Sequence, residues 1–316
     1  MSHGSDEHPD PIPLRWRVAL LLLSRLPQGV LSRTTGWLAE RWIPRILRQP
    51  VLAAFAAATG LDPGEAEHPL VEYPSVSALF TRRLQEGARR WPEDPDLPAS
   101  PVDGVVGAFG PVRGGTALQA KGRSYSLAGL LGSREEAGRF EGGGFLTIYL
   151  SPRHYHRIHS PVSGNIRWAR SIPGALLPVN APAVAGVPQL FPRNERLVAG
   201  IGGTSGEVCL VAVGAFNVGR ISAAFDPGWN GGEGKGVTNR EGVREPEERR
   251  YRPPLPIERG EELMAFHLGS TVVLLFGPET LEGRAFGPGV AGGSEIRVGA
   301  PLLDSLPASE NPSSGI

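Results

Sequence analysis

Glycine and proline recur through most of the chain after residue 90, and their frequency limits the possible folds more than any other feature of the sequence. The 316 residues include 43 glycines and 31 prolines, which favour turns and shorten helices. Between them stand short apolar runs that predict strands at 145–150, 208–213, 219–225 and 272–276. Because 40% of all residues are apolar, these strands have enough material for a core. The pattern predicts a β-rich body rather than a helical bundle.

The N-terminal part has a different texture, with helical patterns that break near Pro27 and Pro44. An alanine-rich run at 51–58 ends this part, and a further short helix is predicted after Ser75. The predicted fold class is therefore α+β, in which N-terminal amphipathic, membrane-associating helices precede a β-rich domain. The predicted division is a disordered tail at 1–12, a helical membrane-associating region at 13–95, the β-rich domain at 96–300 and a flexible tail at 301–316.

The prediction of a membrane-associating region depends on a local excess of positive charge in a chain that is neutral overall. Lys+Arg and Asp+Glu are equal at 32 each, which gives no overall attraction to nucleic acid. Between residues 11 and 50, however, Glu40 is the only acidic residue, and it faces seven arginines interleaved with tryptophan and leucine. These arginines are Arg15, Arg17, Arg25, Arg33, Arg41, Arg45 and Arg48. Such a segment suits the surface of an anionic membrane, and it equally suits a helical pair packed on its own domain.

The early apolar residues are too few for a membrane span. The longest early run, Val18 to Leu23, has six residues, whereas a helix needs about 20 to cross a bilayer. Any membrane association is therefore expected to be peripheral.

The segment from Asp226 to Glu258 is rich first in glycine and then in charged residues. We expect a long loop here, which is either mobile or a lid over a site. The sequence does not decide between the two.

Three separate patches contain residues that could carry chemistry. The first ends in Asp103-Gly104, which by itself indicates only a turn. The second contains His154, His156 and His159 directly after a predicted strand, where histidines can exchange protons or bind a metal. No nearby carboxylate completes a metal site there, so acid/base chemistry is favoured. The third is the step Gly269-Ser270 at the start of an apolar strand, which is compatible with a simple turn or bulge.

Cysteine and lysine usage exclude other chemistries. Cys209 is the only cysteine, so the chain has no intramolecular disulfide and no cysteine-rich metal site. The lysines are Lys121 and Lys235 alone, which offers little to an enzyme that holds pyridoxal phosphate on a lysine.

Taken together, the patches resemble the phosphatidylserine decarboxylases of the prokaryotic, pyruvoyl-dependent type. Residues 101–104 are similar to that family's P-x-D-G motif, 155–161 to Y-H-R-x-H-x-P and 268–271 to L-G-S-T. Further segments fall in family order, and the resemblance covers roughly residues 14 to 280. These segments are 79–82, 178–180, 190–196 and 213–215. The sequence departs from the family pattern at Val102, where alanine is commoner, and at Pro192, which alters one loop.

The resemblance implies that the chain is a proenzyme that cuts itself at Gly269–Ser270. The Ser270 hydroxyl would attack the Gly269 carbonyl, with His159 as the base and Asp103 as the carboxylate that orients it. Ser270 would then become a covalent pyruvoyl group, the cofactor. The products would be a β chain of residues 1–269 and an α chain of residues 270–316, which remain associated.

The resemblance also implies the reaction and its setting. The amine of phosphatidylserine would form a Schiff base with the pyruvoyl group, and loss of CO2 would give phosphatidylethanolamine. His156 would act at this stage as proton donor or as the group that positions the carboxylate, whereas His154 and His267 are bystanders. The expected partners are phosphatidylserine and an anionic membrane surface but no nucleic acid. The expected location is the cytoplasmic face of the bacterial cell membrane, and a homodimer is left open.

Residues three apart point to opposite faces of an ideal strand, so His156 and His159 share a site only if the backbone between them bends. Two other functions are compatible with parts of the sequence. A Ser-His-Asp hydrolase could use Ser270, His159 and Asp103 without cutting the chain. A non-enzymatic membrane-binding module would explain the N-terminal region but leave the three patches without a role.

Overall fold

The computed structural model describes residues 28–120, 123–204, 206–216, 220–229, 238, 243–267 and 270–306, with side chains described from residue 34 onward. Within these residues the helices are α2 (Gln28–Ala39), α3 (Arg45–Thr59), α4 (Val76–Phe80), α5 (Leu127–Leu131), α6 (Arg134–Gly138), α7 (Ala181–Gly186), α8 (Leu190–Arg193) and α9 (Pro278–Leu281), with 3₁₀ turns η1 (Pro63–Glu65) and η2 (Leu70–Glu72). The strands are β1 (Gly104–Pro111), β2 (Thr116–Ala120), β3 (Arg123–Ser126), β4 (Gly144–Leu150), β5 (Arg157–His159), β6 (Gly164–Ile172), β7 (Arg196–Gly203), β8 (Gly206–Val213), β9 (Ile221–Ala223), β10 (Glu247–Ile257), β11 (Glu262–Phe266), β12 (Ser270–Phe276), β13 (Arg284–Phe286), β14 (Glu295–Ile296) and β15 (Leu303–Ser305). The fold is α+β and consists mostly of sheet, as the sequence predicts.

One antiparallel sheet forms the centre of the molecule. Its eight strands lie in the order β10-β6-β7-β8-β12-β4-β1-β14, so β12 lies in the interior with β8 and β4 as its neighbours. All seven residues of β12 are buried. Alternate side chains of this strand enter two different apolar clusters, with Val272 on one face and Val273 on the other. A sheet with both faces covered explains why its strands appear in the sequence as continuous apolar runs.

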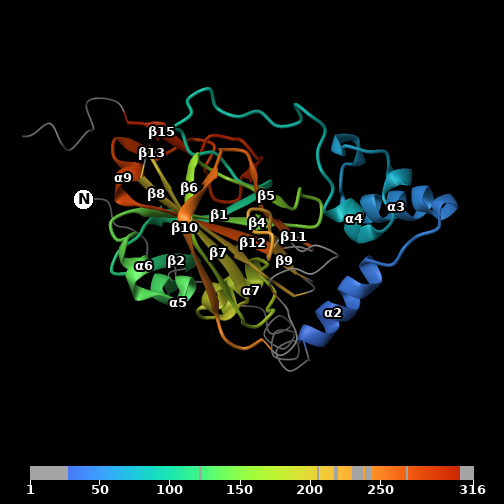
Figure 1. Ribbon diagram of the computed structural model, residues 1–316, viewed down its shortest axis with the longest axis horizontal. Helices are drawn as coiled ribbons and strands as arrows, with labels where there is room; N and C mark the ends of the chain where they lie inside the picture. Colours follow the sequence, from blue (N-terminus) through green and yellow to red (C-terminus); the bar gives the residue numbers. More distant parts are fainter. Residues whose placement is uncertain are drawn as a thin grey trace, which may run out of the picture.

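Different elements cover the two faces of this sheet. On one face lie the short helices α5 to α8, whose apolar side chains join the cluster that contains Val273. On the other lies a smaller sheet, β5-β11-β9, whose residues join the cluster that contains Val272. Figure 1 shows the strands crossing the middle of the molecule with α5, α6 and α7 together on one side.

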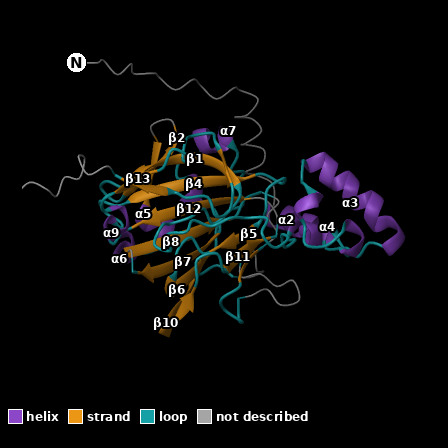
Figure 2. Cartoon of the chain, turned by 90° about the horizontal axis from the view of Figure 1, so that it is seen from above, coloured by secondary structure: helices purple, strands orange, loops and turns teal. Residues whose placement is uncertain are grey.

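The N-terminal helices form a separate lobe at one end of the sheets. In both views α2, α3 and α4 lie beyond β5 and β11 (Figures 1 and 2). This lobe has its own small core around Leu52 and Leu79. Pro44 precedes α3 and Gly60 ends it with a left-handed φ of 74°. The Ser75 hydroxyl accepts from the Ala78 N–H at 3.1 Å and caps α4, as expected for a helix after Ser75.

Two expectations about loops are wrong in part. Residues 247–257 form the edge strand β10, which pairs with β6 instead of belonging to a long loop. Both the alternating exposure of β10 and its prolines suit an edge position, where one row of backbone donors needs no partner. The predicted flexible tail also begins too early, because Leu302 and Leu303 are buried and β15 pairs with β13.

Other expectations fall outside the described residues. The tail at 1–12, the basic residues Arg15, Arg17 and Arg25, and the chain end after residue 306 are among them. No helix of the described residues has the length and apolar character that crossing a membrane requires.

Candidate active site

Ser270 is the first residue of β12 and lies inside the protein. It is 1% exposed, and it stands opposite Leu150 at the end of β4. Its hydroxyl oxygen has no hydrogen-bond partner among the described residues. A buried hydroxyl without a partner is costly and uncommon in a folded protein, so this oxygen is available for a further interaction.

A cavity of about 360 Å³ has Ser270 in its wall, and we call it the Ser270 cavity. Most of its other wall residues are apolar or aromatic, and they come both from the sheet region and from the N-terminal lobe. The residues that line it are Thr35, Phe55, Thr59, Phe80, Tyr149, Leu150, Pro152, Pro178, Val179, Asn180, Ala215, Phe216 and Ser270. The cavity therefore joins the helical lobe to the start of β12.

Asp103 lies just before β1 and is held by an arginine. It is 7% exposed. Its Oδ1 accepts from Arg89 Nε at 3.0 Å and from the Val298 backbone N–H at 2.8 Å, and its Oδ2 accepts from Arg89 Nη2. Arg89 also donates to Glu65 at 2.8 Å. A side chain on the next residue, Gly104, would place its Cβ 2.6 Å from both Ile148 and Tyr149, so only glycine permits this approach of β1 to β4.

His159 ends β5, and both of its ring nitrogens have partners. Nδ1 donates to the Gly260 carbonyl at 2.7 Å, because a carbonyl can only accept. Nε2 therefore carries the lone pair, and it accepts from the Tyr155 hydroxyl at 3.1 Å. The Tyr155 ring stacks on the imidazole, with centroids 5.6 Å apart. Burial lowers the pKa of His159, so the ring is kept in the neutral form that a base needs.

His159 lies on a second cavity, of about 370 Å³, which we call the His159 cavity. Polar and charged residues form most of its wall. The residues that line it are Arg83, Leu84, Gln85, Gly87, Arg89, Trp91, Tyr155, His159, Gly260, Glu262 and Val298. No described residue lines both this cavity and the Ser270 cavity.

His156 precedes β5 and has no exposed surface. Its Nδ1 donates to the His154 carbonyl at 2.8 Å, which leaves the lone pair on Nε2. That Nε2 has no hydrogen-bond partner among the described residues. The ring packs on Phe80 with centroids 4.0 Å apart, and Phe80 also lines the Ser270 cavity. Burial lowers the pKa of His156 to about 3, so the ring is neutral.

The structure brings Asp103 and His159 near each other through the backbone. The His159 N–H donates to the Pro101 carbonyl at 2.9 Å, and the Ala99 N–H donates to the Pro161 carbonyl at 3.0 Å. No hydrogen bond joins the side chains of Asp103 and His159 in the described part of the chain. Each of them has other partners among the described residues.

The two histidines differ in register relative to Ser270. The His156 carbonyl accepts from the Phe266 N–H at 2.9 Å, whereas His159 pairs with Glu262 further back along β11. The register between β5 and β11 is irregular between Glu262 and Met264. The two rings also have different neighbours. His156 packs on Phe80, which lines the Ser270 cavity, whereas His159 stacks on Tyr155 in the His159 cavity.

The two histidines that the sequence analysis sets aside have structural partners. His154 Nε2 bonds to Glu295 at 3.0 Å, and its Nδ1 accepts from the Ser151 N–H at 2.9 Å. His267 Nε2 bonds to the Ser222 hydroxyl at 3.1 Å, and burial lowers the pKa of His267 to about 4. Among the described residues, no three His, Cys, Asp or Glu side chains converge as a metal site would require.

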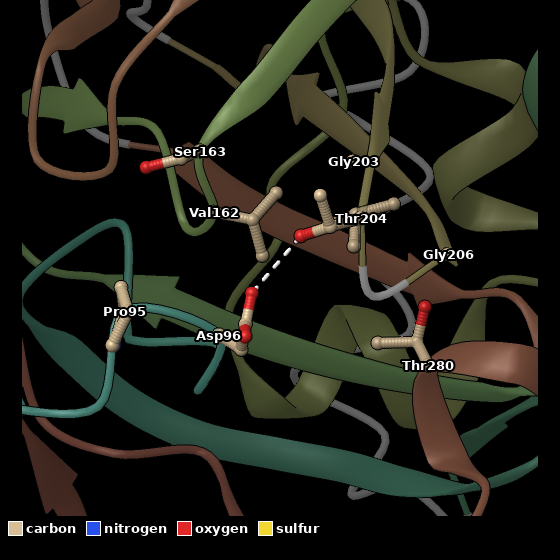
Figure 3. Close-up of a pocket in the computed structure, with 9 residues that line it drawn as sticks. Pro95, Asp96, Val162, Ser163, Gly203, Thr204, Gly206 and Thr280 are labelled. Carbon is tan, nitrogen blue, oxygen red and sulfur yellow. Dashed lines mark hydrogen bonds between the residues drawn. The ribbon is translucent and has the colours of Figure 1, made fainter.

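A much smaller cavity lies elsewhere, between the residue 95–96 segment and the β7–β8 turn. Figure 3 shows the Thr204 hydroxyl pointing at Asp96, to which it donates at 2.9 Å. The volume of this small cavity is about 10 Å³, which has room for no more than about one water molecule. It is too small for a substrate, whereas the two larger cavities have Ser270 and His159 in their walls.

Comparison with known proteins decides the family. The family model for phosphatidylserine decarboxylase matches residues 76–304. The phosphatidylserine decarboxylase proenzyme of Anaeromyxobacter sp. (strain K) is 41% identical over 287 residues, which span 90% of this chain and 98% of the relative. This chain belongs to the phosphatidylserine decarboxylase family. The proenzyme of Brevibacillus brevis is 40% identical over 283 residues, which span 89% of this chain and 95% of the relative.

Family membership confirms the resemblance that the three motifs carry. The family is one of carboxy-lyases, so the expectation that this protein is an enzyme of that class is confirmed. The relatives' names also describe proenzymes of phospholipid metabolism. The expected roles of Asp103, His156, His159 and Ser270 remain predictions.

Sequence reasoning missed two side chains that this decarboxylase places at the site. Arg89 holds Asp103, but it lies outside the three motifs and the residues around it give no sign of a role. Tyr155 lies within the Y-H-R-x-H-x-P segment, yet only the structure shows its hydroxyl on His159. The 155–161 motif therefore contained the information needed to include Tyr155 in the site, whereas no motif contained Arg89.

Proposed function

We propose that the protein is a phosphatidylserine decarboxylase proenzyme that cuts itself at Gly269–Ser270 and then converts phosphatidylserine to phosphatidylethanolamine and CO2. The observation that carries this proposal is the Ser270 hydroxyl, which is buried without a partner among the described residues and lies on an apolar cavity. In a family whose members are named as proenzymes, such a hydroxyl is the expected reagent for self-cleavage.

The cleavage is an acyl shift followed by an elimination. The Ser270 oxygen attacks the Gly269 carbonyl carbon, its proton passes to a base, and the peptide amide becomes an ester. Loss of the Ser270 α-proton breaks the bond between Cβ and the ester oxygen and releases residues 1–269 with a new carboxylate end. Water then hydrolyses the remaining imine to a ketone and ammonia.

His159 is the proposed base and Asp103 the proposed orienting carboxylate. The neutral ring of His159, with its lone pair on Nε2, supports the role of base. Asp103 would have to exchange its bonds with Arg89 and Val298 for one with His159, whose Nδ1–H is held by the Gly260 carbonyl. The Tyr155 hydroxyl occupies that lone pair in the uncut chain, so Tyr155 must give way, or pass the proton on, when Ser270 reacts.

The ketone made from Ser270 is the proposed pyruvoyl group, which supplies an electrophilic carbonyl that accepts electrons as CO2 leaves. The residues around Ser270 fit such a group, because its hydroxyl is free among the described residues and the wall beside it is apolar. His156, with a free Nε2 lone pair, is the proposed group that handles the proton or positions the carboxylate at this stage.

The two products are proposed to remain together. The α chain would begin with β12, which pairs with both β8 and β4 along its length. Cutting before Ser270 removes none of these ladders, and all residues of β12 are buried. Separation of the chains would have to dismantle the centre of the sheet.

The helical lobe is the proposed membrane-associating region, on the cytoplasmic face of the cell membrane. Six large apolar side chains between residues 37 and 51 are exposed, out of eight such side chains among the described residues. These six are Trp37, Leu38, Trp42, Ile46, Leu47 and Val51. Arg41 stacks over Trp37, and Arg48 lies near Trp42. Exposed tryptophans beside arginines suit an anionic lipid surface.

Intact-mass measurement tests the proposal. Wild-type protein should yield a 270–316 fragment with a blocked amino end, and it should release CO2 from phosphatidylserine. Ser270→Ala should stay in one piece because it lacks the attacking oxygen. Thr271→Val is the matched control, since Thr271 is equally buried and its hydroxyl also lacks a partner among the described residues, and this variant should split. An undivided wild-type chain that hydrolyses an ester would instead identify a Ser-His-Asp hydrolase.

A further inference from the structure

Arg82 is a buried cation without a counterion among the described residues. It is 3% exposed, and its Nε and Nη1 have no hydrogen-bond partner within the described part of the chain. Neighbouring Arg83 differs, because its side chain is 64% exposed and pairs with Glu262. Burial of an unpaired charge is strongly unfavourable, so buried arginines are normally matched by carboxylates or backbone carbonyls. Arg82 therefore has binding capacity that no other described residue uses.

The backbone around Arg82 runs beside the histidine motif. Phe80 packs on His156, and the Thr81 carbonyl accepts from Arg157 Nε at 2.9 Å. The 80–82 segment thus lies along Tyr155, His156 and Arg157, with Phe80 in the wall of the Ser270 cavity. The Arg82 charge is close enough to lower the pKa of His156, after the larger effect of burial. Arg82 itself lines neither cavity, but its backbone lies beside the proposed site of decarboxylation and its charge acts on His156 there.

The carboxylates that surround Arg82 already have other partners. Asp103 accepts from Arg89 and from the Val298 N–H, and Glu65 accepts from Arg89 and Arg297. Burial also lowers the pKa of Arg82, although these two acids act against that change. The chain provides a cation here and assigns the nearest anions elsewhere, which is the arrangement expected where an incoming ligand supplies the anion.

We propose that Arg82 binds the phosphodiester of the substrate's head group, an inference that rests on the proposed function. Phosphatidylserine carries two oxyanions, a carboxylate and a phosphodiester. An ion pair with the carboxylate would stabilise the bound substrate and be lost as CO2 forms, which opposes the reaction. The phosphodiester is unchanged by the reaction, so pairing with it holds the head group without that cost. A planar guanidinium can donate two parallel hydrogen bonds to such a group.

Binding to the uncut chain tests the assignment without depending on turnover. The probe is glycerophosphoethanolamine, which has the phosphodiester but no carboxylate, and the host is the Ser270→Ala proenzyme. Adding Arg82→Gln should weaken calorimetric binding roughly ten- to a hundredfold, as expected for loss of hydrogen bonds from a charged group. Adding Arg167→Gln, a control at a half-exposed arginine that pairs with Glu207 and lines neither cavity, should leave binding within about twofold. Arg82→Lys keeps the charge but not the planar fork and should recover part of the affinity.

Each other result overturns the assignment. Unchanged binding in Arg82→Gln, or equal weakening in both glutamine variants, would mean that Arg82 makes no specific contact. Unchanged probe binding together with a raised KM for short-chain phosphatidylserine in processed Arg82→Gln would identify the carboxylate as the partner. Absence of binding to the Ser270→Ala host, while wild type still decarboxylates, would also overturn it, because the proposal takes the unpaired Arg82 from the chain before cleavage. A wild type that neither splits nor releases CO2 would instead contradict the proposed function itself.

Discussion

The two cavities are almost equal in volume, at about 360 and 370 Å³, but their walls differ in chemistry. The Ser270 cavity is lined mainly by apolar side chains, among them Phe55 from α3, and it contains the residue proposed to become the cofactor. The His159 cavity is lined by arginines, a glutamate and polar groups, and it contains the proposed base. An apolar wall suits lipid chains and the loss of CO2, whereas a polar wall gives protons a route to solvent. The difference suggests that substrate is held on one side and protons are exchanged on the other.

Replacing each of the two histidines separately is the strongest test of the contrast between the two cavities. His159→Ala should abolish splitting, because the proposed base is gone, whereas His156→Ala should still split but lose most decarboxylation. Mass analysis of the chain and CO2 release from the split protein measure the two steps separately. Splitting by His159→Ala together with an uncut His156→Ala would reverse the assignment, and the register of His156 opposite Phe266 would then explain why.

Arg89 gives the next largest expected effect, because it supports the polar side of the comparison. Its side chain is 8% exposed and holds Asp103, which is 10% exposed in its side chain. Arg89→Met leaves a buried carboxylate unpaired, which should cost about 3 kcal/mol of unfolding free energy and slow splitting. Chemical denaturation of the Ser270→Ala proenzyme measures the first effect, and time courses of cleavage measure the second.

Arg297 offers the control for Arg89. It pairs with the same Glu65, but its side chain is 70% exposed. Arg297→Gln should change stability by less than about 1 kcal/mol, as usual for an exposed pair. Equal effects of both substitutions would show that Glu65, and not Asp103, is the partner that matters.

The apolar side of the comparison depends on the helical lobe, which adds Thr35, Phe55 and Thr59 to the Ser270 cavity. Replacing Trp37, Trp42 and Ile46 with serine should weaken binding to anionic vesicles about tenfold or more, because the apolar area that enters the lipid is lost. Turnover of a water-soluble short-chain substrate should stay unchanged. Vesicle co-sedimentation and CO2 release measure the two properties.

Leu118→Ser is the control for that triple variant, since Leu118 is also exposed, at 42%, but lies on β2 in the sheet region. It should bind vesicles as wild type does. If the triple variant binds equally well, the exposed residues of the lobe would serve protein contacts instead of lipid.

The sequence predicted the β-rich body because buried strands such as 145–150 and 272–276 appear as uninterrupted apolar runs between glycines and prolines. It failed at 247–257, where charged residues and three prolines suggested a loop. There the charges of an edge strand pair across the surface, as Glu248 does with Arg170 and Arg250. Local composition cannot reveal a pairing with a strand some eighty residues earlier in the chain.

The candidate site was predictable to the extent that its residues lie in motifs. Asp103, His156, His159 and Ser270 each fall in a recognisable segment, and the structure places each of them at or beside one of the two cavities. The partners of these residues were not predictable, because Arg89 and Gly260 contact them only through the tertiary fold. The division into two cavities was equally hidden, since it depends on which face of the backbone each side chain takes.

The smallest expected effect concerns the exclusion of water from the His156 ring, which packs on Phe80 beside the Ser270 cavity. Burial lowers the pKa of His156 to about 3, while an unfolded chain has an ordinary value of about 6.5. The unfolded state therefore binds more protons between these values, so the stability contributed by neutral His156 is complete above about pH 6.5 and is lost as the pH falls toward 3. In the Ser270→Ala proenzyme, His156→Asn should flatten the fall in unfolding free energy between pH 6 and 5 by at most ~1.4 kcal/mol. If the unfolding free energy of His156→Asn falls as steeply with pH, water reaches the His156 ring in the folded protein. The two cavities would then not differ in their access to solvent.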